Sequence, residues 1–208
     1  MRDLIGAIFT RRRASDWPSL VEAIRAGAAF LAQGSSYSYL RARSLLAGPR
    51  LFQDEGFGFA LQICKWEAFA VAAQDLILIL DAELRRGVAA QAHARAAVLA
   101  DLYDAVLAAE AMPEHRRQTG WEDLRAGFAA RLVVVFAAPP QRPDAIARAT
   151  AEAILRHAPI DDLVRAADRE MVVNNVAFRF IDHQSRMRRE FDLGAVGAML
   201  EARIACVA

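Results

Sequence analysis

Apolar residues follow a helical spacing along most of the chain, and the most apolar stretch runs from about residue 58 to residue 86. Between residues 68 and 80 this stretch is apolar nearly all round, and only Gln74 and Asp75 interrupt it. A helix without a polar face is normally surrounded by other helices. We therefore predict that this segment is the central helix of the fold.

Proline, glycine and helix-capping residues divide the rest of the chain into further helical segments. Gly34 separates two of them, and Thr119 with Glu122 has the spacing of a capping box at the start of another. The predicted helices cover 16–33, 35–48, 88–111, 119–136, 143–157, 159–167, 168–190 and the residues after 192. We expect an all-α fold, an antiparallel bundle of about seven helices with no significant sheet.

The valine-rich stretch 132–136 is the one place where a strand can be argued, because valine favours β structure. It continues the helical spacing that begins at Trp121, and no second strand is present to pair with it, so we interpret it as helix. A Pro-rich break follows at 139–143. We interpret residues 16–208 as one helical domain, preceded by a basic N-terminal segment, 1–15, which we expect to be mobile.

Composition and charge exclude several classes of protein. The chain carries 26 basic and 25 acidic side chains, and 55% of its 208 residues are hydrophobic. This balance excludes a disordered acidic tail, and it leaves little counterion release to drive nucleic-acid binding. Abundant alanine and arginine favour helices and also indicate a GC-rich, bacterial coding sequence. Cys64 and Cys206 lack metal-ligand spacing, so we expect free thiols in a cytoplasmic protein.

Motifs that would code for catalysis or cofactor binding are missing from the sequence. It contains no G-x-S-x-G elbow, no phosphate-binding loop and no Glu-x-x-His pair of the kind that builds di-metal sites in helical bundles. We therefore expect no metal and no cofactor. No segment has the length and apolar character of a transmembrane helix. Residues 4–13, an apolar turn followed by three arginines, offer at most a weak peripheral membrane contact.

A segment rich in tyrosine and arginine is the first candidate for a binding site. Tyr39 and Arg43 are four residues apart and share a helix face, and Arg41 lies between them in the sequence. An Arg–carboxylate pair beside aromatic rings is a common way to hold an anionic ligand. We expect Arg41 or Arg43 to pair with Glu67, either as part of a pocket or simply to join two helices.

The second candidate lies on the predicted central helix. Trp66 and Glu67 lie near its start, and Glu67, Gln74 and Asp81 recur every seven residues, which places a polar seam on an apolar helix. This seam either lines a pocket near Trp66 and Glu67 or faces solvent. Farther along the chain, Asn174 shares a helix face with apolar residues, so we expect it to be buried.

Three functions remain open at this point. The first is a cytoplasmic interaction or accessory protein without catalysis, which binds a protein partner or a second copy of itself through a helical surface. The second is a small-molecule-binding bundle that uses the two patches described above. The third is a hydrolase of unrecognised type that uses one of the serines in 35–38, although no histidine or acid can be assigned to them.

Overall fold

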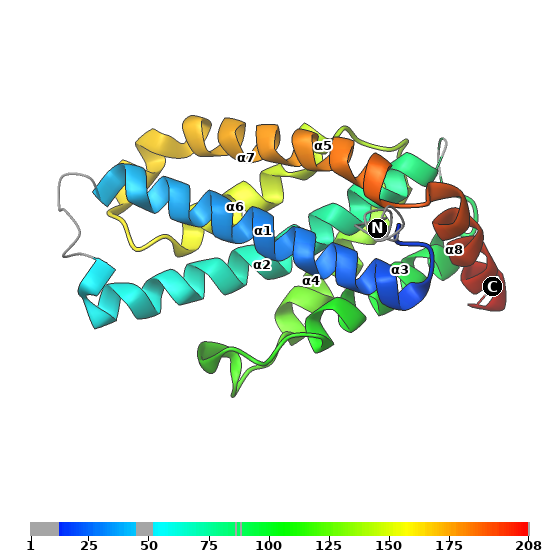
Figure 1. Cartoon of the computed structure of the whole chain (residues 1–208), viewed down its shortest axis with the longest axis horizontal. Helices are drawn as coiled ribbons and strands as arrows, with labels where there is room; N and C mark the ends of the chain where they lie inside the picture. Colours follow the sequence, from blue (N-terminus) through cyan, green and yellow to red (C-terminus); the bar gives the residue numbers. More distant parts are fainter. Residues whose placement is uncertain (1–12, 45–51, 86, 88, 208) are drawn as a thin grey trace, which may run out of the picture.

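Helices account for most of the region that the computed structural model describes, namely residues 13–44, 52–85, 87 and 89–207 (Figure 1). The helices of ten residues or more in this region are α1 (Trp17–Ser44), α2 (Glu55–Leu84), α3 (Ala92–Ala108), α4 (Glu122–Phe136), α6 (Arg148–His157), α7 (Asp162–Glu190) and α8 (Leu193–Val207). A single turn, α5 (Pro143–Ile146), and a 3-10 turn, η2 (Glu114–Arg116), lie between them. No strand occurs in the described residues, where an isolated bridge joins Ala14 to Phe191. The predicted all-α fold of about seven helices is confirmed.

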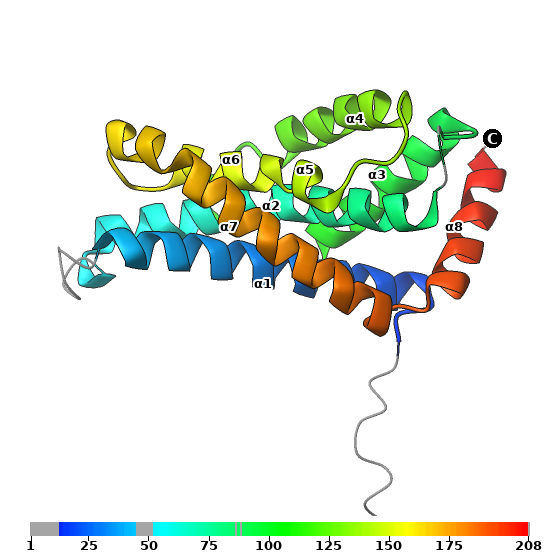
Figure 2. The same cartoon turned by 90° about the horizontal axis from the view of Figure 1, so that it is seen from above.

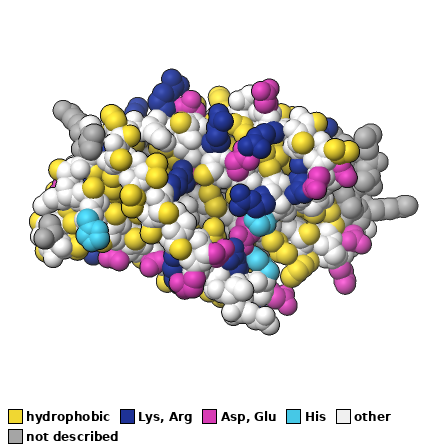
Figure 3. Space-filling model, turned by 180° about the vertical axis from the view of Figure 1, so that it is seen from behind, with side chains coloured by type: hydrophobic (Ala, Val, Ile, Leu, Met, Phe, Trp, Pro, Cys, Tyr) yellow, Lys and Arg dark blue, Asp and Glu magenta, His cyan; other side chains and the backbone are white. Residues whose placement is uncertain are grey.

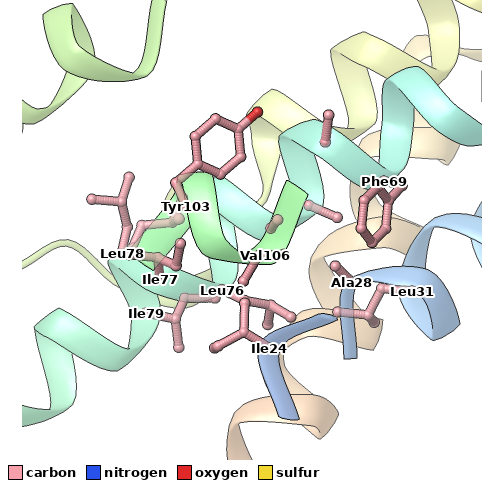
Figure 4. Close-up of a cluster of buried hydrophobic side chains, with 14 of the residues drawn as sticks. Ile24, Ala28, Leu31, Phe69, Leu76, Ile77, Leu78, Ile79, Tyr103 and Val106 are labelled. Atoms are coloured by element: carbon pink, nitrogen blue, oxygen red, sulfur yellow. The ribbon is translucent and has the colours of Figure 1, made fainter. Parts of the chain in front are cut away.

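α2 is the central helix, as its apolar pattern predicts. α1, α3, α4, α5 and α6 all pack on it, and every residue from 72 to 81 is buried. Four consecutive apolar side chains, 76–79, can all be buried only if neighbours cover every side of the helix. In Figure 4, Ile24 of α1 and Tyr103 of α3 belong to the cluster of side chains that surrounds this stretch.

α1 is one continuous helix, so the predicted stop at Gly34 is wrong. Its buried face continues on both sides of the glycine, with Leu31 before it and Ser35 after it. Gly34 also leaves room for Arg179 of α7, because an added Cβ would lie 3.0 Å from the Nη1 atom of that arginine. Packing therefore outweighs the roughly 1 kcal/mol that a glycine costs inside a helix.

α7 is likewise a single helix where the sequence pattern predicts two, 159–167 and 168–190. It begins after Asp161, whose side chain accepts a hydrogen bond from the backbone N–H of Leu163 at 2.9 Å. From there no proline or glycine interrupts the chain before residue 190. The helix is 29 residues long, which corresponds to about 43 Å.

Two predicted helix starts are also wrong. α3 begins four residues later than expected, because Gln91 before it has a left-handed backbone with φ 50°. Thr119 does not cap α4, since Trp121 occupies the N-cap position and no side-chain bond closes it. The valine-rich stretch 132–136 is helical, as interpreted, and forms the end of α4.

The long helices run back and forth along one axis. α2 and α7 both run opposite to α1, and α8 crosses the end of the bundle where α1 begins (Figures 1 and 2). α7 follows the upper edge of the molecule in Figure 1 and lies nearest the viewer in Figure 2, so one side of it is at the periphery. Phe136 and Ile146, on either side of the 139–143 break, belong to the same buried cluster.

Candidate functional site

The polar seam predicted on α2 is buried. Glu67, Gln74 and Asp81 are all at most 5% exposed, and Asp75 is fully buried. The alternative in which the seam faces solvent is therefore wrong. A buried charge or amide needs a partner, and each of these four side chains has one from another part of the chain.

Glu67 is held by the turn between α3 and α4. Arg116 donates from Nε to Oε1 at 2.6 Å and from Nη2 to Oε2 at 2.5 Å. His115 Nε2 lies 2.7 Å from Oε1, and His157 Nε2, at the end of α6, lies 3.9 Å from Oε2. Burial raises the pKa of Glu67, but the hydrogen bonds from Arg116 and His115 and the charges of Arg116 and His157 outweigh it, so the pKa is lowered. The carboxylate is ionised at neutral pH, and Arg116 is its main counterion.

Two imidazoles beside an ionised carboxylate are capable of acid–base chemistry. Burial lowers the pKa of His157, and Glu67 opposes this only in part. His115 meets the ring of Trp121 edge-on, and Arg116 lies over the same ring at 4.9 Å. Because Arg116 already occupies both oxygens of Glu67, the arrangement favours a structural role. On the face opposite to Figure 1, histidines reach the surface among interleaved acidic and basic side chains (Figure 3).

Gln74, the next residue of the seam, and the adjacent Asp75 connect α2 to three other helices. Gln74 Nε2 donates to the hydroxyl of Tyr103 and to a backbone carbonyl of α4, both at 3.1 Å. Asp75 Oδ2 accepts from the backbone N–H and the hydroxyl of Thr150 at 3.0 and 2.6 Å. Its other oxygen lies 2.5 Å from Nη1 of Arg131. These contacts fix α3, α4 and α6 around the central helix.

Asp81 makes the corresponding contacts near the end of α2. Arg85 Nε donates to Oδ2 at 2.8 Å, and Arg95 Nε of α3 donates to Oδ1 at 2.5 Å. Arg95 also donates to Glu201 of α8 at 2.7 Å, and Arg85 donates to the carbonyl oxygen of Ala138 at 3.0 Å. Every buried carboxylate of the seam is thus matched by an arginine, which explains the seam as a connection between helices.

The tyrosine–arginine patch of α1 binds a different carboxylate from the one predicted. The Tyr39 hydroxyl donates to Oδ2 of Asp168 at 3.1 Å, and Arg43 Nε donates to the same oxygen at 2.6 Å. Asp168 lies on α7 and is buried. The predicted pairing of Arg43 with Glu67 is therefore wrong, and this pair joins α1 to α7. Arg41 is exposed.

Trp66 lies at a hollow of about 190 Å³ whose lining does not include Glu67. α1 contributes Gln33 to this hollow, and Lys65 and Glu110 add charges at its rim. The ammonium group of Lys65 lies 5.1 Å from the centroid of the Trp66 ring. The predicted site residues therefore occupy separate environments, and the structure does not assemble them into one pocket.

The outer side of α7 is the surface that the sequence interpretation missed. Asn174 is exposed, so its predicted burial is wrong. We use the term outer stripe for seven exposed residues of α7: Leu163, Val164, Ala167, Met171, Asn174, Phe178 and Ile181. Met171 and Phe178 also line hollows at the edge where α7 meets α1. From residue 164 to residue 181, successive members of the stripe are alternately three and four residues apart, which is the spacing of a coiled-coil seam. The spacing is visible in the sequence, but it does not reveal which side of a doubly apolar helix is inside.

Other features of the described residues limit the chemistry. This part of the chain has no group of three or more His, Cys, Asp or Glu side chains placed to hold a metal ion. None of its helices combines the length and apolar character needed to cross a membrane. Ser38 accepts a hydrogen bond from Arg179, and the buried hydroxyl of Ser35 has no partner among the described residues, so the structure pairs neither with a histidine.

The segment 4–13, for which a membrane contact is predicted, lies outside the described residues except for Arg13. No family model, curated protein or solved structure matches the chain.

Proposed function

We propose that the protein is an interaction protein without catalytic activity, which pairs the outer stripe of α7 with the same stripe of a second copy. The observation that carries this proposal is the exposure of large apolar side chains along one side of a long helix. Leu163 is 81% exposed, Phe178 72% and Met171 49%. Taking about 150–250 Å² for an aromatic side chain, the whole stripe exposes roughly 600 Å².

An apolar area of this size suits a weak but specific contact. It equals about the largest patch that a typical monomer exposes, roughly 300–600 Å². Two stripes facing each other bury about 1,200 Å², the lower end of the range for specific interfaces. We therefore expect a reversible dimer.

An antiparallel arrangement suits the shapes of the side chains. With the two-fold axis between residues 172 and 173, Ala167 faces Phe178 of the second copy, and Met171 faces Asn174. A small residue opposite a large one fills the space between two helices. A single polar residue in such a seam fixes register and orientation at a cost in stability, which gives Asn174 a role.

Charges at the two ends of the stripe support the same orientation. Asp161 and Asp162 lie at the N-terminal end of α7, and Arg186, Arg188 and Arg189 lie in its last turns. Antiparallel pairing brings the acidic end of one helix beside the basic end of the other, whereas parallel pairing brings like charges together. The helix dipoles favour the antiparallel arrangement as well.

The polar clusters inside the molecule are consistent with this proposal. Each buried carboxylate described above is explained by its contacts between helices, so none is left to suggest a reaction. We place the interaction in the cytoplasm, where the free thiols Cys64 and Cys206 would stay reduced. Nucleic acid is not among the proposed partners, because a net charge of +1 releases few counterions.

Sedimentation equilibrium of the full chain tests the proposal. We expect the mass to approach twice 22.8 kDa with rising concentration. Phe178→Glu should restore the monomer mass, because it places a charge in the apolar contact. Val133→Glu is the matched control, since Val133 is 70% exposed on α4, away from the stripe. A monomer at all concentrations, or a dimer that Phe178→Glu leaves intact, contradicts the proposal.

The hollow at Trp66 supports a second candidate, the binding of a small molecule. Its volume of about 190 Å³ is below the roughly 300–1,000 Å³ of usual ligand pockets, so this candidate ranks second. A ligand there would change the tryptophan fluorescence of the protein, and Trp66→Phe would remove that change. If a small molecule changes the tryptophan fluorescence of Trp66→Phe as much as that of the unmodified protein, it does not bind in this hollow.

A further inference from the structure

A hollow of about 440 Å³ lies between the first half of α1 and the last turns of α7. On the α1 side its lining includes three small residues, Ala23, Ala26 and Gly27, so the two helices do not close against each other there. The volume lies within the roughly 300–1,000 Å³ that small-molecule pockets occupy.

His183 of α7 forms part of this hollow and is only 8% exposed. Its Nδ1 atom is buried and has no hydrogen-bond partner in the described part of the chain. An added Cβ on Gly27 would lie 2.6 Å from Nε2, so only glycine leaves room for the ring. Burial lowers the pKa of His183, and the neutral imidazole has one N–H to donate.

Two arginines of the lining have no acidic partner in the described part of the chain. Arg186 lies over the ring of Phe30, with its guanidinium carbon 5.2 Å from the ring centroid. Neither Arg186 nor Arg189 forms an ion pair among the described residues. Both oxygens of Glu22 accept from a neighbouring arginine of α1, and Glu190 has an interaction of its own. Positive charge is therefore available in the hollow, beside an aromatic ring.

We infer that this hollow binds a small carboxylate with an apolar body, such as an aromatic acid. The carboxylate lies between Arg186 and Arg189, because guanidinium groups commonly bind carboxylates. It also accepts a hydrogen bond from Nε2–H of His183, the ring nitrogen that lies beside Gly27 of the lining. The apolar body packs against Phe30 and the alanines of α1. None of these groups belongs to the outer stripe of α7, although Arg186 and Arg189 also form part of the basic end of α7 described above.

Titration of the full chain with benzoate, followed by NMR of the imidazole Cε1–H groups, tests this inference. The chain has four histidines, and exposed His93 is the internal control. We expect a saturable shift of His183 with His93 unchanged, and at least tenfold weaker binding of acetate, which has no ring. No shift, equal shifts of all four histidines, or equal affinity for acetate would overturn the inference.

Two substitutions locate the site. Arg186→Met should weaken benzoate binding at least tenfold, whereas Arg188→Met, which removes the ion pair of Arg188 with Glu83 outside the hollow, should not. Gly27→Ala should abolish binding by displacing the imidazole, and Gly58→Ala, with nothing within 4 Å of the added Cβ, is its control. Circular dichroism checks that each variant is folded. Unchanged benzoate affinity in folded Arg186→Met or Gly27→Ala would refute the site.

Discussion

Arg116→Met leaves the carboxylate of Glu67 buried without its main counterion. The Glu67 side chain is 5% exposed and that of Arg116 12%, so the pair qualifies as buried. Breaking such a pair costs about 3–5 kcal/mol, because an uncompensated charge remains inside. The free energy of unfolding of a single domain is about 5–15 kcal/mol. We therefore expect the variant to stay folded at pH 7 but to unfold at a clearly lower urea concentration than the unmodified protein.

Urea unfolding followed by circular dichroism measures this loss, and a double-mutant cycle assigns it. Glu67→Gln should cost less, about 1–2 kcal/mol, because Arg116 keeps its 2.6 Å contact with Asp123. The double variant should be more stable than the sum of the single losses implies, by at least about 1 kcal/mol. Arg117→Met, at an exposed neighbouring residue, should change stability by less than about 0.5 kcal/mol.

The pH dependence provides a second check on the same pair. The lowered pKa of Glu67 means that its contribution to stability is fully present above its ordinary pKa of 4.5 and is lost as the pH falls through the folded-state value. In Arg116→Met, burial raises that pKa, so the stability gap to the unmodified protein should narrow from pH 7 to pH 4. Arg116→Met should therefore not lose less than about 1 kcal/mol of unfolding free energy, which is typical of a surface pair. Such a small loss, or a stability difference between the variant and the unmodified protein that does not change with pH, would contradict a buried Glu67–Arg116 pair.

Three further predictions concern other parts of the fold. Burial lowers the pKa of His183 below 6.5, so the stability of the protein should decrease as the pH falls from 7 through the folded-state pKa of this histidine. If the stability of His183→Gln decreased as steeply with falling pH, that would contradict this. Gly34→Ala, like Gly58→Ala, should raise the melting temperature through a gain of about 0.5–1 kcal/mol, because the flexible end of Arg179 can move away from the added Cβ; a lower melting temperature for Gly34→Ala would contradict this. Thr150→Val removes the hydroxyl donor to buried Asp75 and keeps the backbone donor. It should lower the free energy of unfolding in urea by about 1–3 kcal/mol, and a change near zero would contradict a contribution of this hydrogen bond to stability.

The sequence predicts those parts of the fold that depend on local patterns. The burial of α2 follows from its apolar character, and the helical state of 132–136 follows from continuous spacing and the lack of a partner strand. The stop at Gly34 fails because tertiary packing, with Arg179 against the glycine, compensates for its low helix propensity. Local signals of this kind are weak when long-range contacts oppose them.

The contacts of the candidate site are not predictable in the same way. Arg116 is 49 positions from Glu67, and Asp168 is 129 positions from Tyr39. Nothing near any of these residues selects one arginine among the 26 basic residues of the chain. The outer stripe of α7 was missed for a related reason, since a helix with two apolar sides shows which side is buried only once its neighbours are placed.

Cysteine cross-linking between the α7 helices of two copies tests the antiparallel dimer. With Cys206 replaced by serine, antiparallel pairing brings position 163 of one copy beside position 181 of the other, whereas the two 163 positions lie about 28 Å apart. We expect Leu163→Cys and Ile181→Cys chains to cross-link when they are mixed and not when either variant is alone. Cross-linking of each variant with itself, or in no combination, would contradict it.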